Sequence, residues 1–486
     1  MSVLNGLGIH EDENIYTIPY DHPYFAQLFL GAIFALVGFP DSPSYTGADL
    51  NSINMLYFVP RILMGLLAIA DTFLIFKISE VLYDRKVAFI ASLLFAASPS
   101  SWLIRRVWLE PIQLPFILLS ILFVVYFGLK RAPHREDNLP SIRYILLLVS
   151  GIFLGLAIFT KIPVITMIPL LLFLVCRNND QKVKSMIVWF LPVILIPLIW
   201  PVNAFLLEEF DKWWEGFLWQ ATERPERPLS LALDTLLQID GPLIIIGVIG
   251  ILYICIRNKD FILILWILPL IAFLQVLGYV SYWYFIPILP AFCIGSAKLI
   301  VELCGRVRAL RPQRILVFSA SAIIVIIGLL STVSLLILDV NSAYFEAVSL
   351  VLRYIITFST SANNDSYDVT LVGSRWVPSF SWILDYVYST NTDYKQFQNQ
   401  IFPLNSDKLI LIVDRDLLRY LESEHADTVQ LEKILRDTHA IAIIERYLIP
   451  EESKTISSLL KYPNRSLVLN TAVRIMEIKA NIIPAK

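Results

Sequence analysis

Charged residues are scarce in this chain, and their scarcity excludes most classes of soluble protein. Of its 486 residues only 16% are charged and 57% are hydrophobic, whereas soluble domains have about 25% charged and about 45–50% apolar residues. The net charge of −2, without basic clusters, argues against binding to nucleic acid. This composition is that of a membrane protein.

Cysteine is nearly absent, and no internal repeat or low-complexity tract is apparent. The four cysteines lie within or at the end of apolar runs, and no two form a Cys-x-x-Cys pair. We therefore expect neither a zinc site nor a disulfide framework. Small buried hydrophobic residues are the better interpretation of Cys176, Cys255, Cys293 and Cys304.

Lysine and arginine are missing from residues 1–60. This segment is acidic instead, with Glu11-Asp12-Glu13 followed by Asp21-His22-Pro23. Carboxylates held beside a membrane surface could perform chemistry there, although a solvated acidic tail would also contain Glu-Asp-Glu. His22 could be a helix-entry cap, a metal ligand or an acid–base partner. Because Asp-His-Pro leads directly into an apolar stretch, we favour an ordered loop.

Ten apolar stretches are long enough to be membrane spans, which need about 20 residues each. Residues 24–39 are also apolar but shorter, and we expect them to lie along the membrane surface as an interfacial helix. Residues 1–57 then form a first outer loop. The ten stretches are 58–80, 87–104, 110–129, 143–159, 161–177, 186–206, 241–256, 261–278, 283–303 and 314–338.

The loop charges predict the orientation of these spans. One alternating set of connections holds fifteen Lys and Arg residues, and the other holds six. By the positive-inside rule the richer set is cytoplasmic, so the N-terminal segment and residues 339–486 are extracytoplasmic. The six residues on the predicted outer side are Arg105, Arg106, Lys161, Lys212, Arg224 and Arg227.

The last third of the chain differs in composition. Its apolar runs are short, at 368–373, 408–414, 440–445 and 466–478, and they alternate with helix-like segments at 415–424 and 428–437. Strands alternating with helices predict a small α/β domain. We therefore divide the chain into a transmembrane domain, 1–340, and an extracytoplasmic α/β domain, 341–486.

The second predicted outer loop, around Arg105-Arg106, breaks the charge trend. Two adjacent arginines on this side need compensation, and a phosphate fits because the guanidinium fork matches its oxygens. Lys161, between two spans, is a further outward cation that could contact phosphate or extend to the interface. Glu110 follows the arginines in the same loop.

Aromatic residues also collect on the predicted outer side. Trp213, Trp214 and Trp219 lie in loop 207–240 with Glu215, Glu223 and Glu226, and we favour an interfacial belt over a sugar platform. Tyr282 and Tyr284 extend that belt or line a lipid-facing groove.

Four segments resemble the GT-C superfamily of polyprenyl-phosphate-sugar-dependent glycosyltransferases, in particular the branch with protein O-mannosyltransferases and bacterial aminoarabinose transferases. DHPYFAQL at 21–28 looks like that branch's His-Pro-Pro-Leu-Gly-Lys segment, with Tyr24 for the second proline and Gln27 for the lysine. The others are RRVWLEP at 105–111, GLAIFTK at 155–161 and YFIPILP at 284–290. The likeness covers about residues 9–340.

The resemblance implies transfer of a sugar with inversion at its anomeric carbon. A first-loop carboxylate, Asp12 or Glu13, would be the general base, and Glu110 would assist. Arg105, Arg106 and Lys161 would stabilise the departing lipid-linked phosphate. Glu11, Asp21, His22, Tyr282 and Tyr284 are further site candidates. The donor would be a polyprenyl-phosphate sugar, and the acceptor a protein, lipid or glycan.

The family normally has a span before its acidic loop, and this chain shows none ahead of Glu11. We therefore expect a truncated or misassigned start. Glu11, Asp12, Glu13 and His22 leave a divalent-metal site open.

Two other functions fit the sequence in part. A transporter would place Asp71, the one acidic residue that the sequence puts deep in a span, against a cavity open to both sides. A non-catalytic scaffold for the outer domain would tolerate loss of Asp12, Glu13 and Glu110.

Overall fold

The computed structural model describes most of the membrane part of the chain and the strands that follow it. The described residues are 20, 22–38, 50–101, 106–129, 140–177, 181–223, 227–305, 310–337, 346–347, 350–351, 369–373, 393–396, 408–414, 440–448 and 468–479.

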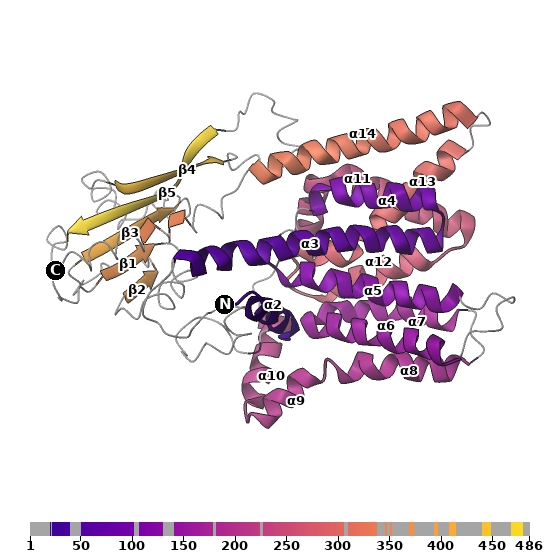
Figure 1. Cartoon of the computed structure of the whole chain (residues 1–486), viewed down its shortest axis with the longest axis horizontal. Coiled ribbons are helices and arrows are strands. Elements are labelled where there is room, and N and C mark those ends of the chain that lie inside the picture. Colours follow the sequence, from indigo (N-terminus) through magenta and orange to yellow (C-terminus); the bar gives the residue numbers. More distant parts are fainter. Residues whose placement is uncertain are drawn as a thin grey trace.

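Long helices run side by side in a bundle, and the chain alternates between its two ends (Figure 1). We call the end where α2 lies the α2 end. The helices are α2 (Phe25–Leu36), α3 (Leu50–Leu82), α4 (Arg85–Ala97), α5 (Leu109–Leu129), α6 (Pro140–Thr160), η2 (Ile162–Met167), α7 (Ile168–Cys176), α8 (Lys182–Leu195), α9 (Ile199–Leu206), α10 (Phe210–Leu218), η3 (Trp219–Glu223), α11 (Leu229–Asn258), α12 (Ile262–Val276), η4 (Tyr282–Ile288), α13 (Leu289–Gly305) and α14 (Leu310–Ile337).

Each of the ten predicted stretches coincides with a helix or with two consecutive helices. Five helices in the described part are long and apolar enough to cross a membrane, or six if the bent pair α8–α9 is one span. Shorter apolar helices, such as η2–α7 and α12, account for other stretches. The protein is a multi-pass membrane protein, and a count of ten crossings stays a prediction.

The boundaries correct several details of the sequence-based prediction. Helix α3 begins at Leu50, so the predicted loop 1–57 includes its first two turns. Helix α4 ends at Ala97 rather than near residue 104. The stretch 161–177 starts as the 3-10 helix η2, because Pro163 has no N–H to continue α6. Helix α11 begins at Leu229, inside the predicted loop 207–240, which also contains α10.

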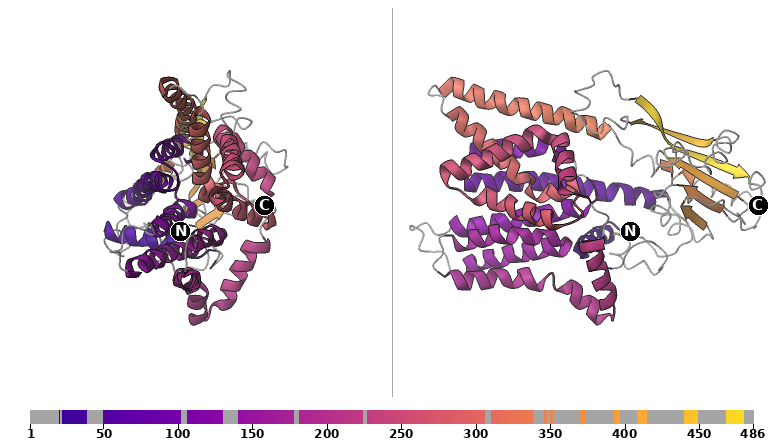
Figure 2. Two further views of the ribbon diagram at one scale, coloured as in Figure 1. Left: turned by 90° about the vertical axis from the view of Figure 1, so that its right-hand side faces the viewer. Right: turned by 180° about the vertical axis from the view of Figure 1, so that it is seen from behind.

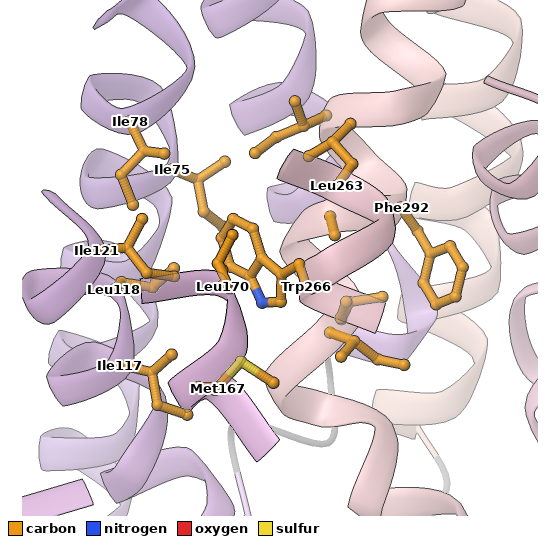
Figure 3. Close-up of a cluster of buried hydrophobic side chains, with 14 of the residues drawn as sticks. Ile75, Ile78, Ile117, Leu118, Ile121, Met167, Leu170, Leu263, Trp266 and Phe292 are labelled. Carbon is orange, nitrogen blue, oxygen red and sulfur yellow. The ribbon is translucent and has the colours of Figure 1, made fainter. Parts of the chain in front are cut away.

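The bundle core is apolar and closely packed. Figure 3 shows Trp266 of α12 among side chains of α3, α5 and α7, including Ile75, Ile121 and Leu170. The Trp266 indole is satisfied inside the core, because its N–H donates to the Pro287 carbonyl at 2.9 Å.

Glycines allow two pairs of helices to approach at backbone distance. A Cβ built on Gly250 of α11 would lie 2.2 Å from the Gly295 carbonyl oxygen of α13. A Cβ on Gly151 of α6 would lie 2.2 Å from the Trp189 carbonyl oxygen of α8. Any larger residue would push these helices apart.

Helix α2 lies at one end of the bundle, across the helices that it contacts (Figure 1). Its inner face is buried at Ala26, Leu30 and Phe34, and Phe25 packs edge-on against Phe116 of α5 with ring centroids 5.2 Å apart. Leu36 is 81% exposed. A short helix with one packed and one exposed apolar face fits the predicted interfacial position.

Five strands form a mixed sheet beyond the α2 end, near the start of α3 and the end of α14 (Figures 1 and 2). The order is β2-β1-β3-β5-β4; β1 pairs in parallel with β2 and β3, and β5 pairs antiparallel with β3 and β4. The four predicted apolar runs correspond to β1, β3, β4 and β5, whereas β2 was not predicted. The strands are β1 (Val369–Gly373), β2 (Asp393–Gln396), β3 (Lys408–Asp414), β4 (Ala440–Leu448) and β5 (Val468–Lys479). The helices predicted at 415–424 and 428–437 lie outside the described residues.

Candidate functional site

Two opposite charges meet inside the α2 end of the bundle. Glu110 is in the first turn of α5, and Lys161 directly follows α6. The Lys161 ammonium donates a hydrogen bond to the Glu110 carboxylate, and the Lys161 and Glu110 side chains are only 8% and 4% exposed. Each charge therefore depends on the other for compensation. The Lys161 side chain is thus turned toward Glu110 inside the bundle, whereas one of its two interpretations was a side chain extended toward the interface.

Two further contacts hold Lys161 in place. The side-chain amide of Gln113 donates to the carbonyl oxygens of Ala157 and Lys161, both at 2.8 Å. On its other side, the Lys161 ammonium nitrogen lies 4.0 Å from the centroid of the Tyr284 ring. Because a ring face attracts a cation, this ammonium is fixed between a carboxylate and an aromatic ring.

Aromatic rings connect Lys161 to the second loop. The Arg106 guanidinium carbon lies 5.1 Å from the Trp108 ring centroid, and Trp108 packs on Trp283 at 4.8 Å. Trp283 in turn contacts Tyr284 at 6.3 Å. Burial lowers the pKa of Arg106 from its usual value, yet arginine stays charged at neutral pH. Two cations therefore stand at the ends of one row of rings.

Tyr282 and Tyr284 belong to the 3-10 helix η4, whose start is tied to the loop before α11. The Arg227 guanidinium donates to the Ser281 hydroxyl at 3.3 Å. The Arg227 backbone pairs with Gly278 and Val280, each at 2.9 Å. These bonds fix where the two tyrosines enter the bundle.

The residues just before α2 are anchored to the segment between α9 and α10. The Tyr20 hydroxyl donates to the Glu209 carboxylate at 2.5 Å. This hydrogen bond, and a second one from Lys212, lower the pKa of Glu209. Burial raises the pKa of Tyr20, and Glu209 adds to the effect. Pro23 is buried and His22 is half-buried, so both residues pack against the bundle at the start of α2.

The predicted site residues divide into two groups. Glu110, Lys161, Arg106, Tyr282 and Tyr284 lie together at the α2 end, in contact with one another through the pair and the row of rings, and His22 precedes α2 at the same end. No cluster of three His, Cys, Asp or Glu that could hold a metal ion occurs among the described residues. Glu11, Asp12, Glu13, Asp21 and Arg105 lie outside the described residues.

Gln113 and Asp240 are buried polar residues at this end that were not predicted. Gln113 positions the Lys161 backbone, but a single amide in an apolar run gives little signal. Asp240 is 6% exposed and accepts a hydrogen bond from Ser98. The sequence did carry a signal for it, because Asp-Gly-Pro before an apolar run is typical of a helix N-cap.

The sequence and the fold were compared with those of known proteins. Residues 21–205 match the model of the dolichyl-phosphate-mannose-protein mannosyltransferase family. The fold is similar to that of ArnT from Cupriavidus metallidurans in its apo state, with a TM-score of 0.53, 11% identity, and coverage of 96% of this chain and 89% of that one. The chain is thus similar to the GT-C glycosyltransferases, in sequence over the matched segment and in fold over most of its length.

Two further structures share the GT-C fold. The same ArnT bound to undecaprenyl phosphate has a TM-score of 0.51 at 11% identity, covering 96% of this chain and 90% of that one. The apo oligosaccharyltransferase of Archaeoglobus fulgidus has a TM-score of 0.53 at 12% identity, covering 86% of this chain and 66% of that one. A search of curated proteins gave no match.

The family match contains Arg106, Glu110 and Lys161 but neither Asp12 and Glu13 before it nor Tyr282 and Tyr284 after it. The matched segment therefore contains the charged pair and both arginines of the second loop. The rings that connect them come partly from η4, outside the match.

Proposed function

We propose that this protein transfers a sugar from a polyprenyl-phosphate-linked donor to an acceptor, with inversion, on the extracytoplasmic side of the membrane. The observation that carries the proposal is the buried pair of Glu110 and Lys161 beside Tyr284. An ammonium group has three N–H donors, and the Glu110 carboxylate accepts one of those of Lys161, so a further hydrogen-bond acceptor can bind to this group. The ArnT structure that holds undecaprenyl phosphate supports a lipid-linked phosphate as the group that accepts this hydrogen bond.

The reaction makes one bond and breaks one at the anomeric carbon, and it moves one proton from the acceptor to a carboxylate. A carboxylate of the first loop, Asp12 or Glu13, takes the proton of the acceptor hydroxyl. The acceptor oxygen attacks the anomeric carbon, and the bond from that carbon to the phosphate oxygen breaks. The phosphate leaves with the electron pair of that bond, and its added charge needs nearby cations.

Three cations are proposed to stabilise the negative charge of the leaving phosphate: Lys161, Arg106 and Arg105. Lys161 is preorganised by Glu110, and the Arg106 guanidinium lies over the Trp108 ring. Donors fixed before the reaction need no rearrangement as charge develops, which is the source of electrostatic catalysis. In this proposal Glu110 acts through Lys161 rather than as a second base, because its carboxylate is already engaged.

The location of the site suits such a donor. Helices α5 and α6 bring the pair to the α2 end, where the interfacial helix α2 packs. A polyprenyl phosphate has its chain in the bilayer and its phosphate at the interface. A cation at the α2 end can therefore contact the phosphate while the lipid chain stays in the membrane. Four basic residues lie in or beside the terminal turns of α7, α8 and α11 at the opposite end, which supports an outward-facing site by the positive-inside rule. They are Arg177, Lys182, Arg257 and Lys259.

The test is transfer by the purified full-length chain in lipid vesicles, supplied with labelled polyprenyl-phosphate sugars and with peptide, lipid or glycan acceptors. We expect a labelled product from one acceptor class and loss of transfer in Lys161→Met. Lys212→Ala is the matched control, because Lys212 is an exposed lysine that pairs with Glu209 away from the site. Transfer that persists in Lys161→Met, or in the double variant Asp12→Asn/Glu13→Gln, would contradict these assignments.

Transport, the main alternative, depends on Asp71. This residue is fully buried in α3, and neither of its carboxylate oxygens has a hydrogen-bond partner in the described part of the chain. The cavity between α3 and α4 is lined by Gly65, Ala68, Ile69, Thr72, Phe95, Ala96 and Ser101, without Asp71. A carboxylate enclosed by packing does not favour a transport pathway.

A further inference from the structure

Helices α8, α9 and α10 carry the chain from the opposite end of the bundle to the α2 end and then across it (Figures 1 and 2). Helices α8 and α9 meet at a bend of 41°, and as a pair they are long and apolar enough to cross a membrane. Helix α10 runs across the direction of the bundle helices (Figure 1). Because spans run through the bilayer, a helix that lies across their ends is parallel to the membrane surface.

The turn between α9 and α10 has a fixed backbone. Glu208 is in the left-handed conformation, with a φ of 60°. The Glu209 N–H donates to the Ala204 carbonyl at 2.8 Å, and the Glu208 N–H donates to the Phe205 carbonyl at 3.2 Å. These two bonds form the Schellman motif that ends a helix. The turn therefore sets the direction of α10 relative to α9, and we call the segment Ile199–Leu218 the α9–α10 corner.

Helix α10 has one aromatic face and one charged face, because residues spaced by three or four positions share a face of a helix. The aromatic face consists of Phe210, Trp213, Trp214 and Phe217. Their rings contact one another, with centroids 5.1–6.1 Å apart. The charged face consists of Asp211, Lys212 and Glu215.

The aromatic face of α10 is turned toward the bilayer. Its Trp213 packs on Trp200, with ring centroids 5.5 Å apart. Trp200 belongs to the first turn of α9, which the chain passes on its way out of the membrane, so it lies on the bilayer side of α10. The charged face of α10 is accordingly turned away from the bilayer.

Exposed apolar side chains continue without interruption from α8 onto the corner. Those of α8 face lipid in a membrane span, and an exposed apolar surface of this extent is rare on a protein in water. Leu206 is 72% exposed and Trp214 is 48% exposed. The exposed apolar residues along this path are Leu191, Ile194, Leu195, Leu198, Ile199, Val202, Phe205, Leu206, Leu207, Phe210 and Trp214.

We propose that the α9–α10 corner is embedded in the leaflet at the α2 end, with its apolar side among the lipid chains and its charged face toward water. The partner of this surface is the lipid bilayer itself. Helices of this kind bury their apolar face by about 5–10 Å at the boundary between headgroups and acyl chains, where tryptophan is enriched. Since Tyr20 donates a hydrogen bond to Glu209 of the corner, the segment before α2 is tied to an element that the membrane holds.

Nitroxide labels on introduced cysteines test which side of the corner meets lipid. The full-length chain is placed in lipid nanodiscs with one copy per disc. Leu206→Cys and Trp214→Cys report the apolar side. Asp211→Cys and Glu215→Cys are the matched controls, because they lie on the charged face of the same corner. The parent chain, labelled in the same way, gives the background of the native cysteines.

The measurement compares relaxation of each label by oxygen, which concentrates in lipid, and by a nickel chelate, which stays in water. We expect the ratio of oxygen to nickel effects to be severalfold higher at positions 206 and 214 than at 211 and 215. The first two labels should lie at a depth of about 5–10 Å. No sugar donor is needed, so this result is independent of the proposed transfer activity.

Two outcomes would overturn the proposal. Equal access of the nickel chelate to all four positions would place the corner in water. Low access of both reagents to positions 206 and 214 would show that protein, rather than lipid, covers the apolar side. Trp214→Cys removes ring contacts within α10, whereas Leu206 is exposed, so Leu206→Cys decides the test if the Trp214 variant does not fold.

Discussion

The Lys161 ammonium nitrogen lies 4.0 Å from the centroid of the Tyr284 ring, and these two residues come from segments that are separated by most of the bundle in sequence. Lys161 sits where α6 ends at a proline-containing 3-10 helix, and Tyr284 lies in η4, a second such helix. Both 3-10 helices, η2 and η4, lie at the α2 end. The interruptions in otherwise continuous apolar stretches are thus where the candidate site is built.

Substitution of Tyr284 tests whether the ring or its hydroxyl matters. Tyr284→Phe keeps the ring over Lys161, whereas Tyr284→Leu removes it. A cation–ring contact is worth about 0.5–2 kcal/mol, which corresponds to roughly 2- to 30-fold in affinity. We expect donor binding to weaken by that amount in Tyr284→Leu and to change little in Tyr284→Phe, measured as donor KM or as affinity for polyprenyl phosphate. Equal losses in both variants would assign the contact to the hydroxyl.

Breaking the buried pair should separate stability from activity. Glu110→Gln leaves the Lys161 charge uncompensated, and removing one partner of a buried pair costs about 3–5 kcal/mol. We expect a clear fall in the thermal unfolding temperature of the detergent-purified protein. The double variant Glu110→Gln/Lys161→Met should recover most of that stability, because no buried charge is left. Sugar transfer should stay absent in the double variant; recovery of both properties would make the pair purely structural.

The helical architecture was predictable from sequence because a membrane requires every backbone group to be bonded within its helix, which makes spans long, apolar and visible. The sequence singled out Arg106 and Lys161, since basic residues on the poorer side of a positive-inside count need a reason, and it singled out Glu110 by resemblance. The structure brings the three to the α2 end, and their roles in transfer stay predictions. The start and end of each helix were harder to predict. Helix α3, for example, begins at Leu50, because a helix can extend past the apolar stretch into the polar region.

The pairing of Glu110 with Lys161 could not be read from the sequence. They are 51 residues apart, and only the packing of α5 on α6 brings them together. Asp240 was missed for a different reason: it was placed as the last residue of a loop, and its side chain was not considered as a cap for the span that starts beside it. The first-loop carboxylates Asp12 and Glu13 stay predictions from resemblance.

The close approach of α11 and α13 predicts a steric effect at Gly250. An alanine Cβ there would lie 2.2 Å from the Gly295 carbonyl oxygen, and backbone atoms cannot move aside as a side chain can. Overpacking of this kind costs about 1–3 kcal/mol. We expect Gly250→Ala to lower the thermal unfolding temperature. Gly65→Ala is the control, because a Cβ at Gly65 meets nothing within 4 Å; a similar loss in both would show that an effect other than this contact, such as impaired membrane insertion, is responsible.

The contact between Tyr20 and Glu209 should weaken in acid. The pKa of Glu209 is lowered in the folded protein, first by the Tyr20 hydroxyl and then by Lys212. A carboxyl with a lowered pKa stabilises the fold above its unfolded pKa of about 4.3 and loses this contribution as pH falls through the folded value. The Tyr20 pKa is raised, so its hydroxyl keeps its proton at neutral pH and the bond is complete there.

The measurement is amide hydrogen exchange of the segment around His22 and Tyr24, expressed as the ratio of Tyr20→Phe to wild type at each pH so that intrinsic exchange cancels. We expect the ratio to exceed one near neutral pH and to approach one as Glu209 becomes protonated. Glu209→Gln should remove most of the pH dependence, since an amide oxygen accepts the same bond without titrating. A ratio that stays constant from neutral pH to below the carboxyl range would show that Glu209 does not hold this segment. Because Glu209 is 36% exposed, the change should be confined to the residues beside Tyr20, without unfolding of the bundle.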